Sequence, residues 1–152
     1  MYQYGQPDPK AEMAAQFAAQ NLEPLTKILM EAIDKLELPT RLVGDVEVQK
    51  EDGIINLASG YITITASTTE YPRIGGTRTV PCWDVSAWKT YHATRHEPGG
   101  VDEAQIGHAL NNFSAAAMAL NAIMKEMIDI HFQNLGEAEA YASLYDGEEA
   151  YF

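Results

Sequence analysis

The chain has a single cysteine, Cys82, among its 152 residues. An internal disulfide and a zinc site built from several cysteines are therefore excluded, and we expect a small, half-buried thiol. Lysine and arginine are scarce too, with 10 of them against 22 aspartates and glutamates and a formal net charge of −12. Because such a surface repels phosphate backbones and anionic membranes, neither nucleic acid nor a membrane is expected as a partner.

Long apolar runs are also missing. The longest, "SAAAMALNAIM" at 114–124, is too short and too rich in alanine to cross a bilayer, and no signal-peptide pattern occurs. We therefore expect a protein that is made and assembled in the cytoplasm. The length and an apolar content of 46% are ordinary for one globular domain.

The few basic residues are unevenly placed. No lysine or arginine follows Lys125, whereas seven carboxylates do: Glu126, Asp129, Glu137, Glu139, Asp146, Glu148 and Glu149. Four of the ten basic residues fall between 73 and 95. The acidic end can meet this basic region within a chain or between subunits.

The sequence predicts an α+β fold with N-terminal helices, a small antiparallel β-meander and a long C-terminal heptad helix. Residues 1–9 contain two prolines and read as an extended arm. One domain then spans 10–136, with helices at 10–38, strands at 41–81 and a helical part at 83–136; the acidic tail is 137–152. Pro24 divides the first part into two helices or kinks one.

The strands are expected as a three-stranded meander within 42–65, because "VEV" and "YITIT" alternate apolar and polar residues. Residues 66–81 are rich in threonine, glycine and proline, which indicates a long loop or an irregular edge hairpin. Loops of this length in a small domain tend to bind partners.

The C-terminal helix carries the clearest pattern. Asp102 and Gln105 are placed as a capping box, and Gly136 as the terminator. Between them apolar residues recur at alternating spacings of four and three, which is typical of a helix that associates with other helices. We predict an oligomeric helical core, with a trimer as the expected state, through Ile106, Leu110, Phe113, Ala117, Leu120, Met124, Met127 and His131.

The stretch "HATRHEPGGVD" at 92–102 offers a metal site as an alternative. If the residues before Pro98 are helical, His92 and His96 lie four apart on one face, and Asp102 or His108 completes a shell. No glutamate directly follows His92, as the zinc-protease pattern requires. The alternative interpretation is that these histidines form only local hydrogen bonds, in which case no cofactor is expected.

The pattern His-x-x-x-His-x-x-Gly-Gly-x-Asp, here His92, His96, Gly99, Gly100 and Asp102, resembles a short motif of bacteriophage virion proteins, especially tail-fibre and appendage chains. The resemblance covers eleven residues and implies a junction between modules of an elongated, usually trimeric protein. It implies a location in the virion and other virion proteins as partners. Unlike such chains, this one continues from the motif into a predicted heptad helix.

These observations favour a non-enzymatic structural or assembly protein of a bacteriophage particle that self-associates through its long helix. Two alternatives remain. One is a metal-dependent hydrolase that uses His92, His96 and Asp102, and the other is an acidic anti-defence inhibitor that binds a basic host protein.

Overall fold

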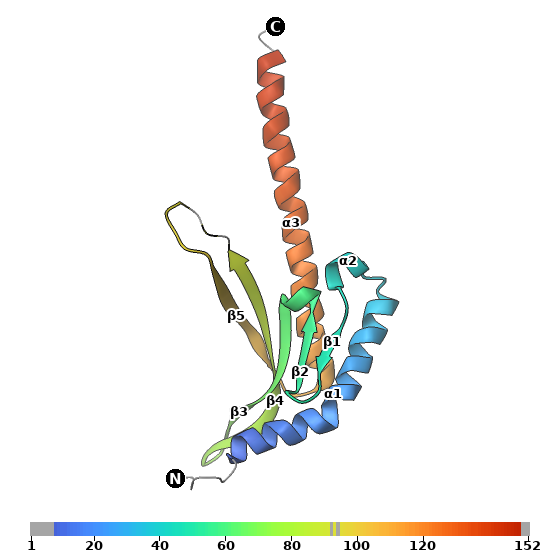
Figure 1. Ribbon diagram of the computed structural model, residues 1–152, viewed down its shortest axis with the longest axis vertical. Coiled ribbons are helices and arrows are strands. Elements are labelled where there is room, and N and C mark those ends of the chain that lie inside the picture. The colour runs from blue at the N-terminus through green and yellow to red at the C-terminus, as the bar shows by residue number, and fades with distance from the viewer. Residues whose placement is uncertain (1–7, 92, 94, 150–152) are drawn as a thin grey trace.

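The computed structural model describes residues 8–91, 93 and 95–149, which form a helix-covered sheet from which one long helix projects (Figure 1). Along the chain, one long helix precedes a five-stranded sheet and another long helix follows it. In order, the elements are α1 (Pro9–Lys35), α2 (Thr40–Val43), β1 (Glu47–Gln49), β2 (Ile54–Leu57), the short 3₁₀ helix η1 (Ala58–Gly60), β3 (Ile62–Arg73), β4 (Gly76–Tyr91), β5 (Gly100–Ala109) and α3 (Asn112–Glu149).

The sheet is an antiparallel meander in which each strand pairs with the next, in the order β1-β2-β3-β4-β5. Successive side chains of a strand point to opposite faces, so its apolar residues gather on one of them. Ile62 lies opposite Ala87, and Ile64 lies opposite Val85 and Ile55. All five are 7% exposed or less, and both α1 and α3 pack on this face.

Helix α1 begins where the sequence supplies a cap, since the Asp8 side chain accepts a hydrogen bond of 3.0 Å from the Lys10 amide and Pro9 is the first helical residue. Leu22, Leu25 and Leu29 turn inward to the core. Pro24 lies inside the helix, where its ring cannot donate the usual backbone hydrogen bond. Figure 1 shows α1 bending part-way along its length, as expected at an internal proline.

Helix α3 begins at Asn112, because the Asn111 side chain accepts a hydrogen bond of 2.8 Å from the Ser114 amide. Its first half covers the sheet with small side chains, Ala115, Ala116 and Ala119, followed by Leu120 and Ile123. Beyond Ile123 no residue of the described chain is fully buried on this helix. Its second half extends away from the domain toward the top of Figure 1.

The predicted order of N-terminal helix, sheet and C-terminal helix agrees with the structure, but the predicted elements are wrong in several places. The N-terminal part is one long helix, not several. The sheet has five strands instead of three, because 66–81 forms a hairpin that leads into β4, with its turn at Ile74 and Gly75, and because 100–109 forms β5. A hairpin was one of the two predicted alternatives, but its strands lie inside the sheet and not at its edge. The structure of residues 1–7 in the predicted arm lies outside the described residues.

The largest error is in the part predicted to be helical, 83–136. Residues 83–91 belong to β4 and 100–109 to β5, so the capping box at Asp102 and Gln105 does not exist and Asn111 caps α3 instead. Gly136 does not end the helix, which continues to Glu149. In the described residues no helix has an apolar stretch long enough to cross a membrane.

Candidate functional site

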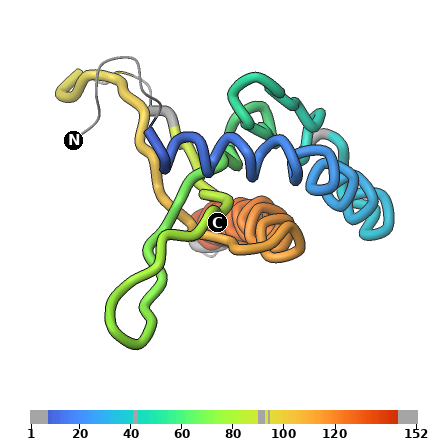
Figure 2. Tube along the Cα trace, turned by 90° about the horizontal axis from the view of Figure 1, so that it is seen from below, coloured from blue at the N-terminus to red at the C-terminus, as the bar shows by residue number. Residues whose placement is uncertain are grey.

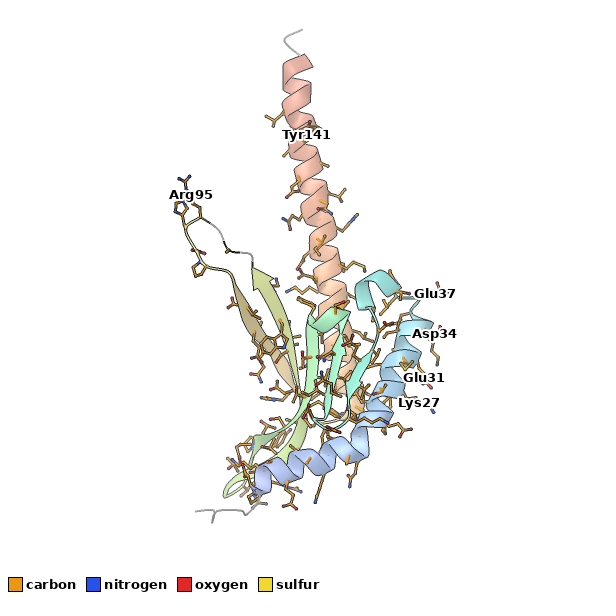
Figure 3. The ribbon with its side chains drawn as sticks, viewed as in Figure 1. Lys27, Glu31, Asp34, Glu37, Arg95 and Tyr141 are labelled. Atoms are coloured by element: carbon orange, nitrogen blue, oxygen red, sulfur yellow. The ribbon has the colours of Figure 1, made fainter. Side chains whose placement is uncertain are left out.

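The histidine stretch forms the connection between β4 and β5 instead of a helix. His96 is exposed there, whereas Asp102 lies on β5 opposite Lys89. His92 falls outside the described residues. Figure 3 shows Arg95 at the tip of this hairpin, away from the sheet. Within 8–91, 93 and 95–149 no group of three or more histidine, cysteine, aspartate or glutamate side chains is placed to hold a metal ion.

His108 belongs to a different group, on the face of β4 and β5 opposite to Trp83 and Val85. Its Nδ1 lies 3.7 Å from the Cys82 sulfur, and its Nε2 lies 3.1 Å from the Gln105 amide nitrogen, which donates to Asp84 at 3.0 Å. Burial, and secondarily the charge of Asp84, raise the pKa of the Cys82 thiol. A raised pKa leaves less thiolate at neutral pH, which makes this thiol a weaker nucleophile than an exposed cysteine. The contacts of Cys82 and Asp84 with His108 and Gln105 join β4 to β5. Cys82 is fully buried, not half-buried as predicted.

A cleft of about 520 Å³ lies between the β4–β5 hairpin and α3. Alanines and Met118 contribute to its lining, together with Lys89, Lys125, Glu126 and Asp129. Glu126 accepts a hydrogen bond from the Tyr61 hydroxyl at 3.3 Å and lies 3.7 Å from Lys89. Burial and the nearby Glu126 raise the pKa of the Tyr61 hydroxyl. The formal charges of the two lysines and two carboxylates that line the cleft cancel.

The predicted oligomer seam is divided by the fold. Ile106 and Leu110 precede α3, on β5 and the bend after it, so the seam is not continuous along one helix. Leu120 is 5% exposed and belongs to the core. Of the remaining positions, Phe113, Ala117 and His131 are exposed, and Met124 and Met127 are half-buried. The sequence therefore identifies an amphipathic helix but not the side that packs on the sheet, which is the alanine side.

The part of α3 that leaves the domain has large apolar side chains in solvent. We call residues 128–144 the distal segment. Its exposed apolar residues are Ile128, Ile130, Phe132, Leu135, Tyr141 and Leu144, with exposed fractions between 46% and 70%. Figure 3 shows Tyr141 on this segment, far from the sheet. The segment contains Asp129, Glu137 and Glu139 but no lysine or arginine.

A second exposed feature lies at the other end of the molecule. The β3–β4 hairpin extends past the helices, as the light green loop of Figure 2 shows, and its tip is at the bottom of Figure 1. We call residues 71–78 the basic ribbon. All are exposed, including Arg73 and Arg78, and Ile74 at the turn is 103% exposed. Because 66–81 forms a hairpin and not a loop, the basic ribbon projects as two paired strands.

Sequence reasoning marked 66–81 as a segment that tends to bind partners and the acidic end as able to meet the basic region, but it did not recognise either as a projection from the domain. The signals were present: an acidic, aromatic tail, and two arginines around the Gly-Gly turn of "YPRIGGTRT". What the sequence does not reveal is that both are held away from the core. Comparisons with protein-family models, with curated proteins and with solved structures find no match to this chain.

Proposed function

We propose that this chain is a non-enzymatic structural or assembly protein of a bacteriophage particle, which self-associates through α3 and binds other virion proteins. One observation carries the proposal: α3 leaves its own domain while exposing a series of large apolar side chains. Exposed apolar surface of this kind marks sites of protein association.

The distal segment also has little to stabilise it as an isolated helix. Helices shorter than about 12–15 residues are marginal in water, and longer ones depend on good helix formers or packing. This segment contains Gly136, which costs about 1 kcal/mol relative to alanine. It has no lysine or arginine to pair with Glu137 or Glu139 along its own surface. Packing against another protein supplies the missing stabilisation.

The resemblance to virion proteins supports the particle setting. The described part of that motif lies on the exposed connection between β4 and β5 and at the start of β5. A role in joining parts of an assembly is consistent with this placement. The expected oligomer is a trimer.

Light scattering coupled to size-exclusion chromatography at micromolar concentration tests the proposal. The wild-type chain is expected to elute as an oligomer. Phe132→Asp is expected to dissociate it without unfolding it, because Phe132 lies in the distal segment, is 65% exposed and contributes little to the monomer core. Asn121→Asp is the matched control, since it places the same charge at another exposed position of α3 and keeps the oligomer. A wild-type chain that stays monomeric contradicts the proposal.

A further inference from the structure

We propose that the distal segment of α3 in one copy docks on the basic ribbon of a second copy, so that the copies join head to tail. The inference rests on the proposed function, because it takes α3 as the element of self-association. It adds the surface that receives α3.

Charge complementarity is the first argument. After Lys125 the chain has seven carboxylates and no lysine or arginine. At the ribbon, Lys10 pairs with Glu70 at 3.4 Å, and the Thr79 hydroxyl also donates to Glu70 at 2.9 Å. Glu70 is thereby occupied, and Arg73 and Arg78 have no ion-pair partner among the described residues. Two free guanidinium groups match the carboxylates of the distal segment.

Apolar complementarity between the two surfaces is the second argument. Ile128, Phe132 and Leu135 lie at spacings of four and three, so they share one face of the helix, and they are 47%, 65% and 50% exposed. Glu139 follows Leu135 by four residues and continues that face. On the ribbon, Ile74 is fully exposed and Tyr71 is 53% exposed, between and beside the arginines. Each surface thus combines an apolar centre with charges of one sign, and the signs are opposite.

The fold prevents the two surfaces from meeting within one chain. The distal segment and the ribbon lie at opposite ends of the longest axis of the molecule (Figure 1). The distal segment and the basic ribbon can therefore meet only between copies, whereas Lys89 and Glu126, from the basic region and the acidic end recognised in the sequence, already pair within the chain. Parallel pairing of two distal segments, by contrast, brings like charges together with no cation to balance them.

A contact between two different surfaces of the same chain has a geometric consequence. Such heterologous contacts close into a ring when the rotation between copies allows it, and otherwise extend into a filament. The expected trimer corresponds to a ring of three copies.

Charge reversal at the ribbon tests the inference. The variant Arg73→Glu/Arg78→Glu is expected to raise the apparent dissociation constant of the oligomer at least about tenfold, as the loss of close interfacial charge pairs does. Sedimentation velocity measures it, and circular dichroism checks the fold. The control Lys27→Glu/Lys50→Glu makes the same change in net charge at exposed positions elsewhere and is expected to assemble as the wild type does. A third variant, Ile74→Asp, tests the apolar centre with both arginines kept.

A mixing experiment distinguishes the ribbon from other surfaces. Glu137→Lys/Glu139→Lys reverses the helix side, so this variant alone is also expected to lose assembly. In an equal mixture with Arg73→Glu/Arg78→Glu, every junction between unlike copies pairs opposite charges. Unlike copies are therefore expected to associate into species with an even number of copies, since a ring of three contains one junction between like copies.

The outcomes separate the two proposals. Oligomers that are unchanged by the ribbon variants, or a mixture that stays dissociated, overturn head-to-tail docking while self-association through α3 stands. A monomeric wild-type chain overturns both.

Discussion

The indole nitrogen Nε1 of Trp83 donates a hydrogen bond of 2.8 Å to Oδ1 of Asn112. The amide nitrogen of Asn112 in turn donates to Asn21 at 3.2 Å. The Phe17 ring packs on the Trp83 ring with centroids 5.1 Å apart. These contacts join β4, the first residue of α3 and α1 at one point, so they set the position from which α3 departs.

Asn112→Ala is expected to lower the free energy of unfolding by about 1–3 kcal/mol, because it leaves a buried indole N–H without an acceptor. Trp83 is fully buried, so water cannot replace the lost partner. Urea unfolding followed by tryptophan fluorescence measures the change. Asn121→Ala, at an exposed position of the same helix, is the control and is expected within about 0.5 kcal/mol of wild type. Equal effects of the two substitutions contradict the role assigned to Asn112.

At Gly53, just before β2, the backbone comes close to α1. Its φ is +65°, and a Cβ atom there would lie 2.8 Å from the Cβ of Ala18. Gly60 has a φ of +91° with no atom near its Cβ position. Both alanine variants carry backbone strain, so the difference between them isolates the steric contact. We expect Gly53→Ala to be about 1–3 kcal/mol less stable than Gly60→Ala in urea unfolding, the usual cost of overpacking. Similar stabilities would show that α1 moves aside freely.

The Cys82 thiol gives a pH dependence with a definite sign. Because its pKa is raised in the folded protein, first by burial and then by Asp84, the folded state holds the thiol proton more tightly than the unfolded state. This stabilisation is complete below the unfolded pKa and is lost as pH rises through the folded pKa. Stability is therefore expected to fall at alkaline pH, and less steeply in Cys82→Ala. Urea unfolding at a series of pH values measures it.

Thiol reactivity provides a second measurement on the same residue. Iodoacetamide is expected to leave the folded protein unmodified at neutral pH and to alkylate it in urea, as detected by mass spectrometry. Rapid alkylation without denaturant contradicts the buried position.

The errors of the sequence analysis have identifiable physical causes. The segment "CWDVSAW" alternates apolar and polar residues with the period of a strand, and the structure places Trp83, Val85 and Ala87 on the covered face. The four-residue spacing of His92 and His96 suggested a helix, so the two-residue period of a strand was overlooked. In β5, residues such as Glu103 and Gln105 favour helices, and pairing with β4 overrides that preference.

The metal hypothesis stays a prediction, since His92 lies outside the described residues, but the helix on which it depended is absent from the described part of 83–109. A spacing of four brings histidines together only on a helix, whereas the structure has a hairpin connection there. The long helix was predictable from Phe113 onward because its apolar period is sustained. Its packing side was not, since alanines that fill a narrow space and alanines in solvent look alike in sequence.

The length of helix α3 also sets a distance. It passes from the core into solvent without a loop, so the 26 residues after Ile123, up to Glu149, span about 39 Å at 1.5 Å per residue. Direction is fixed together with distance: one inserted residue beyond Ile123 would turn everything after it by about 100° and displace it by about 1.5 Å. The length of this helix therefore determines the spacing between the sheet and whatever the far end of α3 contacts.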